Sequence, residues 1–253
     1  KPKNVNCSTD TPDGVCAPVE VSGTSVGYSS YFALDVTDQS APTLLWEYSH
    51  PELGFATTGP AVVRINSRTQ GVSYSTPDTG TNGRWFVVFG SGPTGPVSSG
   101  DSQFLGRSDQ NMKLFVLDLK TGALATTNPI DTGLTFAFAG SMLNATHDSD
   151  TDYQDDAVYI PYVKKCTTTT MPNICANGTW TNGGIGRLFT NEDLDGNNVS
   201  STGNTALNPN NWAWNRVIDD VGPVTSAVAR LEKRSAGLMW LYFGTGRYSF
   251  VQG

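Results

Sequence analysis

The chain has 253 residues, a formal net charge of −7, 27 glycines and 14 prolines. This length can bury one large core or two modest ones, and the many turn-forming residues favour short strands over helices. The negative charge, without any cluster of Lys and Arg, argues against a nucleic-acid-binding surface. No apolar run reaches about 18 residues, so the sequence predicts no membrane span.

Short runs of β-branched and aromatic residues, separated by Gly, Pro, Asn and Asp, are typical of an all-β protein. Three kinds of strand recur along the chain. A strand ending in Leu-Asp covers 31–35 and 114–118, and an entry strand after Gly-Pro covers 59–64 and 222–230. An apolar strand ending in Phe-Gly-(Ser/Thr)-Gly covers 85–92 and 240–246. Repeated strand types predict repeated four-stranded sheets, as in a β-propeller.

The spacing of the repeat sets the expected number of blades. Phe89 and Phe243 lie 154 residues apart, and 156–163 is the equivalent strand of a middle blade. This gives about 77 residues per blade, and about three to four blades over 28–253, after an N-terminal extension over 1–27. An open row of blades leaves unpaired edges, which natural proteins avoid. We therefore expect a larger ring, completed by further blades of the same protein or by a partner chain.

Five aspartates fall within nine residues just before the apolar run 157–163. Carboxylates packed this closely raise one another's pKa unless a cation joins them. Aspartates at relative positions 1, 3, 5 and 9, with a backbone carbonyl at position 7, follow the oxygen spacing of a Ca²⁺ loop. The predicted Ca²⁺ ligands are Asp148, Asp150, Asp152, Gln154 and Asp156. The alternative is a solvated acidic turn.

A second, thinner oxygen-rich turn contains Asp193, Asp195 and Asn197, and is a second candidate metal loop.

The four cysteines form two pairs with the same spacing, Cys7 with Cys16 and Cys166 with Cys175. Two local disulfides that clamp loops are the simplest interpretation, and they indicate an oxidising compartment. A zinc site built from all four cysteines is the alternative, although such sites usually have shorter spacings.

Other patterns are weaker guides to function. The glycines of 90–95 match a dinucleotide-binding motif, but no helix is predicted after them. Residues 23–27 match a nucleophile motif without its strand–turn–helix context. Among the tryptophans, Trp46, Trp85 and Trp240 are expected in the core, because they lie in apolar strands. The candidates for a carbohydrate surface are Trp180, Trp212 and Trp214.

Several of these segments follow one another as in the PilC/PilY-type proteins, which are large secreted factors of type IV pili. The matching segments are Tyr31-Phe-Ala-Leu-Asp-Val-Thr-Asp38, Leu45-Trp-Glu47, Phe89-Gly-Ser-Gly92, Leu114-Phe-Val-Leu-Asp118, 148–156 and Phe243-Gly-Thr-Gly-Arg-Tyr248. The resemblance covers roughly 28–250 and implies a C-terminal β-propeller of the modified quinoprotein type, without quinone chemistry. Tyr153 departs from the family loops, which usually have glycine at that position.

The resemblance also implies a function. Such domains bind Ca²⁺ in an aspartate-rich loop, and the ion affects pilus extension and retraction. The parent proteins lie at the pilus tip or outer surface, reached through the periplasm, and contribute to adhesion. The expected partners are pilin or minor pilins and a host or surface ligand, and no enzymatic activity is expected. A secreted propeller enzyme of the quinoprotein kind and a Ca²⁺-dependent carbohydrate-binding lectin are the alternatives.

Overall fold

The computed structural model describes residues 29–65, 84–94, 106–149, 154–167, 178–191 and 205–247. Within these residues the chain forms antiparallel sheets and three short 3-10 helices, and no α-helix. The expectation of an all-β fold is confirmed. The predicted extension over 1–27 lies outside the described residues.

Two complete sheets form the middle of the molecule. The first has the strand order β3-β4-β5-β6. Its strands are β3 (Ala61–Ile65), β4 (Arg84–Gly90), β5 (Lys113–Asp118) and β6 (Ile130–Asp131). The second has the order β11-β10-β9-β7, and β8 also pairs with β9. Its strands are β7 (Ala137–Ala139), β8 (Thr146–His147), β9 (Ala157–Lys164), β10 (Asn182–Phe189) and β11 (Ala213–Ile218).

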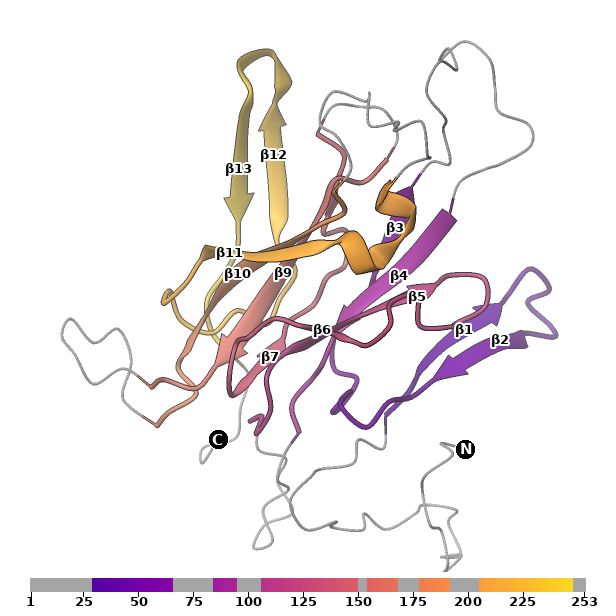
Figure 1. The fold of residues 1–253 in the computed structure, drawn as a ribbon, viewed down its shortest axis with the longest axis horizontal. Coiled ribbons are helices and arrows are strands. Elements are labelled where there is room, and N and C mark those ends of the chain that lie inside the picture. The colour runs from indigo at the N-terminus through magenta and orange to yellow at the C-terminus, as the bar shows by residue number, and fades with distance from the viewer. Residues whose placement is uncertain are drawn as a thin grey trace, which may run out of the picture.

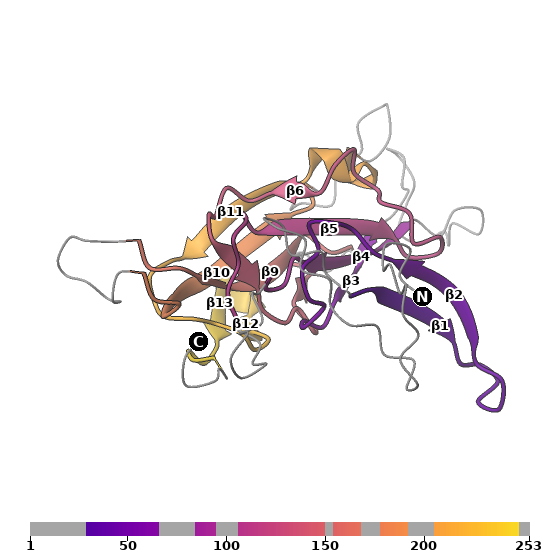
Figure 2. The same ribbon diagram turned by 90° about the horizontal axis from the view of Figure 1, so that it is seen from below.

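A two-stranded hairpin flanks this pair of sheets on each side. The first hairpin joins β1 (Tyr31–Asp35) to β2 (Thr43–Tyr48), and the second joins β12 (Ala229–Lys233) to β13 (Leu238–Tyr242) through the 3-10 helix η3 (Arg234–Ala236). The two remaining 3-10 helices, η1 (Thr205–Leu207) and η2 (Pro209–Asn211), precede β11. The hairpins lie at opposite ends of the molecule in both views (Figures 1 and 2). The described sheets form a row that does not close into a ring.

Three apolar clusters hold the layers together. Alternate residues of β4 face opposite sides of the first sheet, as the two-residue period of a strand requires. Val87 and Phe89 pack with the β1–β2 hairpin, whereas Phe86 and Val88 pack with the second sheet. The far face of the second sheet, with Tyr159 and Ile185, packs with Met239 and Leu241 of the β12–β13 hairpin, which are partly buried there. The layers therefore follow one another in chain order.

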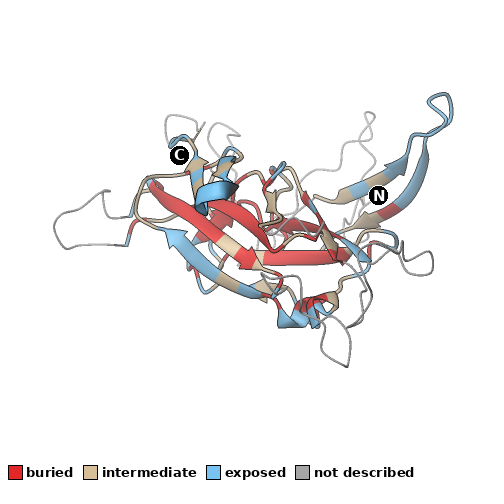
Figure 3. Ribbon diagram, turned by 90° about the horizontal axis from the view of Figure 1, so that it is seen from above, coloured by how far each residue is buried: buried red, intermediate tan, exposed pale blue. Residues whose placement is uncertain are grey.

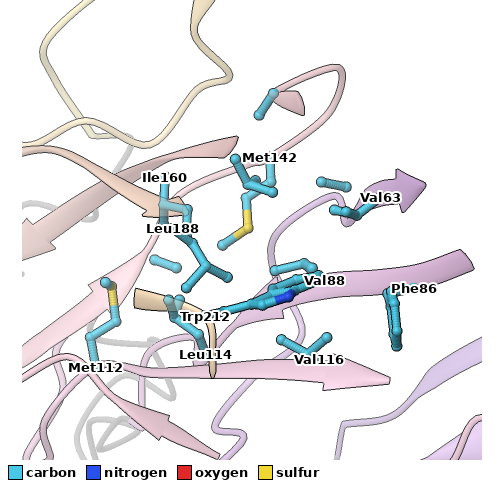
Figure 4. Packing of buried hydrophobic residues seen from close by; sticks show 14 of the residues in the cluster. Val63, Phe86, Val88, Met112, Leu114, Val116, Met142, Ile160, Leu188 and Trp212 are labelled. Carbon is cyan, nitrogen blue, oxygen red and sulfur yellow. The ribbon is translucent and has the colours of Figure 1, made fainter. Parts of the chain in front are cut away.

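The largest cluster lies between the two complete sheets (Figure 4). Phe86, Val88 and Leu114 meet Ile160 and Leu188 there, all of them fully buried. Burial is concentrated in these central strands, whereas the tip of the β1–β2 hairpin is exposed (Figure 3). The core is thus a seam between layers.

The inner edges of the two sheets are joined by backbone hydrogen bonds. The amide of Met142 donates to the carbonyl of Gly59 at 2.8 Å, and the amide of Ala139 donates to the carbonyl of Ser91 at 2.9 Å. Gly90 belongs to this junction, because a Cβ atom placed on it would lie 2.2 Å from the Cβ of Ala139. Gly90, the first glycine of the Phe-Gly-Ser-Gly segment, is therefore needed for the close approach of the neighbouring sheet.

Most predicted strands are confirmed, but one is wrong. The Leu-Asp strands correspond to β1 and β5, and the two strands ending in Phe-Gly correspond to β4 and β13. The entry strand expected over 222–230 begins only at Ala229, and Val224 makes an isolated bridge to Gly246 instead. Asp220 and Gly222 both have positive φ angles, so the chain turns there before it can extend.

The roles predicted for the tryptophans are largely reversed. Trp180 and Trp212 are buried, the first beside Phe138 and the second edge-on to Phe86, and the indole of Trp214 covers Gly186. Trp180 and Trp212 are buried and Trp214 is partly buried, so these candidates for a carbohydrate surface belong to the packing instead. Trp85 and Trp240, which were expected in the core, are exposed. The strand pattern identifies apolar faces but does not show which faces a neighbouring layer covers.

Two isoleucines on neighbouring parts of the second sheet test this packing. Ile160 is fully buried between the sheets, whereas Ile218 is 40% exposed at the end of β11. Ile160→Ala should lower the free energy of unfolding by about 2–5 kcal/mol, because it leaves a cavity in the seam. Ile218→Ala, the matched control, should change it by only about 0.5 kcal/mol. Urea denaturation measures both, and equal losses would contradict the layered core.

Candidate metal centre

The acidic run lies in the loop that joins β8 to β9. These strands pair with His147 opposite Ala157, so the loop begins at Asp148 and ends at Asp156. Asp148, Ser149 and 154–156 are described, whereas Asp150 and Asp152 lie outside the described residues. The prediction that the run leads directly into the apolar strand is confirmed, because β9 begins at Ala157.

Asp156 is the most deeply buried of the described loop aspartates, with 3% of its surface exposed. Its Oδ2 accepts hydrogen bonds from the backbone amide and the hydroxyl of Ser149. Its Oδ1 is buried and has no hydrogen-bond partner among the residues that the structure describes. A buried carboxylate oxygen without a partner is costly, and such groups are usually paired or coordinate a metal. The Oδ1 of Asp156 is therefore a candidate ligand for a cation.

The backbone around Asp156 is fixed on both sides. Its amide donates to the carbonyl of His147 at 2.7 Å, and its carbonyl accepts from the amide of Thr190 at 2.9 Å. The hydroxyl of Thr190 donates to the carbonyls of Asp155 and Asp156, at 2.8 and 3.1 Å. Thr190 follows β10, so the loop is anchored to two neighbouring strands of the second sheet.

Asp155 connects the loop to the first sheet. Its Oδ2 accepts from the amide of Arg64 at 2.8 Å, and its own amide donates to the carbonyl of Arg64 at 2.9 Å. Arg64 lies on β3, so this reciprocal pair joins the edges of the two sheets. Burial raises the pKa of Asp155, and the bond from the Arg64 amide only partly opposes that effect. We call this contact the Arg64–Asp155 junction.

His147 lies beside the acidic groups at the end of β8. Burial lowers its pKa, and the positive charge of Arg230 on β12 acts in the same direction. The nearby carboxylates of Glu232, Asp156 and Asp148 oppose this decrease in pKa. A histidine whose pKa is lowered is neutral near pH 7, so it does not neutralise the loop carboxylates.

The structure brings together part of the predicted ligand set. Asp148 and Asp156 lie at the two ends of the loop. Gln154 is buried and directly precedes Asp155 in the sequence. Among the described residues, no group of three His, Cys, Asp or Glu side chains is placed to hold a metal ion. The second candidate loop, with Asp193, Asp195 and Asn197, lies wholly outside the described residues. Both candidate metal loops therefore stay predictions.

The cysteines are described only in part. Cys166 is buried and disulfide-bonded. Its predicted partner Cys175 lies outside the described residues, as do Cys7 and Cys16. The two pairings stay predictions.

Sequence reasoning missed the residues that anchor the loop. Arg64 lies 91 residues before Asp155, and its backbone takes part whatever its side chain is. Thr190 belongs to no sequence motif that would mark it as an anchor. A hydroxyl residue directly after an apolar strand is nevertheless well placed to donate hydrogen bonds to backbone carbonyls.

The chain resembles solved structures in its fold, but comparisons of its sequence detect no related family or protein. No family model matches it, and no curated protein matches it. Among solved structures, it is similar to the crystal structure of the Pseudomonas aeruginosa PilY1 C-terminal domain, with a TM-score of 0.55 and 20% sequence identity. The match covers 88% of this chain and 40% of that chain. The chain therefore shares its fold with less than half of the PilY1 C-terminal domain.

The Arg64–Asp155 junction can be tested without any metal. Asp155→Ala removes the acceptor for the Arg64 amide and should lower the free energy of unfolding by about 1–3 kcal/mol. Asp155→Asn, the matched control, keeps an acceptor oxygen and avoids a buried charge, so most of the stability should remain. Guanidinium denaturation in the presence of a chelator measures both variants. The junction has no stabilising role if Asp155→Ala unfolds at the same denaturant concentration as the wild type.

Proposed function

We propose that this chain is a Ca²⁺-binding module of a type IV pilus-associated protein, with a role in binding and assembly and not in catalysis. The observation that carries the proposal is the buried, unpartnered Oδ1 of Asp156 in an aspartate-rich loop. The shared fold with the PilY1 C-terminal domain supports the assignment to pili.

The proposed ligands are all oxygen atoms, as a hard cation requires. Asp156 closes the coordination shell from the β9 side, and Asp148 lies at the opposite end of the loop. Asp150 and Asp152 supply further carboxylates, and Gln154 supplies its backbone carbonyl. Tyr159, at the position where an EF-hand has its last ligand, is buried in β9 and directs its hydroxyl to the sulfur of Met239. The loop therefore differs from an EF-hand, and weaker binding is expected.

Bound Ca²⁺ would act on the contact between the two sheets. The ion neutralises the loop carboxylates and pairs the free oxygen of Asp156. Asp155, the next residue, holds the backbone of Arg64 in the other sheet. Without the ion, repulsion among the aspartates opposes the backbone conformation that this junction needs. Ca²⁺ binding would thus stabilise the junction between the sheets and the surface around it.

The proposed architecture is part of a β-propeller of the modified quinoprotein type. The two complete antiparallel sheets correspond to whole blades, and each terminal hairpin corresponds to half a blade. Successive sheets pack face to face in chain order, as blades do. This arrangement gives about three blades, in agreement with the repeat length.

The proposed location is extracellular, at the pilus tip or the cell surface. Pilin or minor pilins are the proposed partners, together with a host or surface ligand. No helix among the described residues is long and apolar enough to cross a membrane. The proposed contribution to adhesion and to pilus extension and retraction follows from the same relation to PilY-type proteins.

Ca²⁺ binding should stabilise the chain measurably. At a free Ca²⁺ concentration 100 times the Kd, the free energy of unfolding should rise by about 2.7 kcal/mol. Asp156→Asn and Asp152→Ala should abolish this gain, whereas Asp38→Asn, in the exposed turn of the β1–β2 hairpin, should keep it. Calorimetric titration and thermal unfolding with and without a chelator measure these effects. Equal heats from the wild type and both loop variants would disprove the Ca²⁺ assignment.

Binding to pilus components should depend on the ion. Purified minor pilins are expected to bind the Ca²⁺-loaded chain about tenfold more tightly than the chelated chain, since the ion would order the loop surface. Asp156→Asn should bind them weakly at every Ca²⁺ concentration, and Asp38→Asn should behave as the wild type. Biolayer interferometry with immobilised minor pilins provides the measurement. Affinities that do not change with Ca²⁺ would show that the ion has no role in the binding of minor pilins.

A further inference from the structure

A polar cluster lies at the end of β9 that is opposite to the acidic loop. It contains Lys164 at the end of β9, Asn182 at the start of β10, and Asp219 and Asp220 directly after β11. Lys164 and Asn182 are directly opposite each other in the antiparallel pair of β9 and β10. Such residues carry their side chains on the same face of the sheet, with Cβ atoms about 4.5–5.5 Å apart. The lysine amine and the asparagine carboxamide are therefore within reach of each other.

One carboxylate oxygen contacts both of these groups. The Nζ of Lys164 lies 2.9 Å from Oδ1 of Asp220, and Nδ2 of Asn182 donates to the same oxygen at 2.7 Å. A carboxyl group that touches two nitrogen atoms in this way can move a proton from one to the other. The cluster thus places a nucleophile, a leaving nitrogen and an acid–base group around one point.

The carbonyl oxygen of the same carboxamide has a fixed donor. The backbone amide of Gly183 donates to Oδ1 of Asn182 at 2.7 Å. Because an amide N–H only donates and an ionised carboxylate only accepts, these two partners determine which end of the Asn182 side chain is the oxygen. An N–H directed at a carbonyl oxygen stabilises the negative charge that develops there when a nucleophile attacks the carbon.

The cluster is largely shielded from water. Asn182 is 1% exposed, and the side chain of Lys164 is 17% exposed. Burial disfavours charged forms, so it favours the neutral amine and neutral acid that amide formation requires. Asp219 holds the amine in place, because its Oδ1 lies 2.6 Å from Nζ of Lys164 and accepts from the hydroxyl of the fully buried Tyr162 at 2.8 Å.

Asp220 is held in a backbone conformation that few residues other than glycine adopt. Its φ angle is +59°, and its amide donates to Oδ1 of Asp219 at 3.0 Å. Residues kept in such conformations by their surroundings cluster at functional sites. Here the turn places the carboxylate of Asp220 against the ends of both β9 and β10.

We propose that Lys164 and Asn182 form an intramolecular amide cross-link, with Asp220 as the catalytic residue. The ammonium of Lys164 gives a proton to Asp220, and the electron pair of Nζ then forms a bond to Cγ of Asn182. The amide of Gly183 stabilises the negative charge on Oδ1. Asp220 gives its proton to Nδ2 and takes one from Nζ, the bond between Cγ and Nδ2 breaks, and ammonia leaves.

The reaction needs no oxidant and no other reactant. Its net result is the conversion of one ammonium group and one carboxamide into one secondary amide and one ammonium ion. The new bond joins the end of β9 to the start of β10 and closes the connection between them into a covalent loop. Like a disulfide, such a bond restricts the unfolded chain. The inference does not depend on the Ca²⁺ site of the proposed function.

A second lysine provides an internal comparison. The Nζ of Lys113 lies 2.8 Å from Oδ2 of Asp131, and the same oxygen accepts from Nδ2 of Asn111 at 3.2 Å. The side chain of Lys113 is 15% exposed, much like that of Lys164. Asn111, however, is only partly buried, and no N–H group of the described residues donates to its carbonyl oxygen. No cross-link is expected there.

The intact mass of the purified chain tests the proposal. After reduction and alkylation of the cysteines, the chain should be lighter than its sequence requires by one ammonia molecule, about 17 Da. Fragmentation of proteolytic peptides should place the link between Lys164 and Asn182. A mass equal to that of the sequence would overturn the proposal. Loss of one water molecule instead, from condensation of Lys164 with Asp219 or Asp220, would overturn the choice of Asn182 as the acceptor.

Three variants test the role of each group. Lys164→Arg keeps the positive charge but has no amine nucleophile, whereas Asp220→Asn keeps both linked residues and suits a positive φ angle. Both should have the full mass of their sequences. Lys113→Arg, the matched control, should still lose one ammonia molecule. Circular dichroism checks that each variant is folded. A loss that persists in Lys164→Arg would overturn the proposed nucleophile, and a loss that persists in Asp220→Asn would overturn the proposed catalytic residue.

Discussion

Each complete sheet of this protein is apolar on both faces, and the rest of the structure follows from that constraint. A sheet with Val87 and Phe89 on one side and Phe86 and Val88 on the other must be covered twice. A neighbouring layer on each side is the arrangement that removes both faces from water. The layers therefore follow one another in a row, and the row ends only where a face remains exposed.

Local patterns in the sequence predicted the strands well. The segments ending in Leu-Asp and Phe-Gly specify β1, β5, β4 and β13, because alternation and turn residues act over a few positions. The place of the acidic run before β9 was predictable for the same reason. The tryptophans were not, since burial of Trp212 and exposure of Trp240 depend on which layer lies opposite. The Arg64–Asp155 junction was also out of reach, because it pairs backbone atoms 91 residues apart.

The acidic loop occupies a sensitive place in this architecture. It leaves the second sheet at the inner edge, where Met142 and Asp155 both contact residues that belong to the first sheet or directly precede it. A buried carboxylate, one oxygen of which has no hydrogen-bond partner among the described residues, lies next to one of the residues that join the two sheets. A change at Asp156 can therefore act on the contact between the two sheets through the peptide bond that joins it to Asp155.

Each sheet is built from one continuous stretch of chain, and among the described residues the apolar faces pack on the layers next to them. Such a molecule behaves like a linear array, whose stability is a sum over units and over the interfaces between nearest neighbours. The terminal hairpins have one interface each, whereas the middle sheets have two. Opening should therefore begin at β1–β2 and β12–β13 and move inward, with the seam around Ile160 the last to exchange its amide hydrogens. In a closed ring no unit is terminal, and this gradient of protection along the chain disappears.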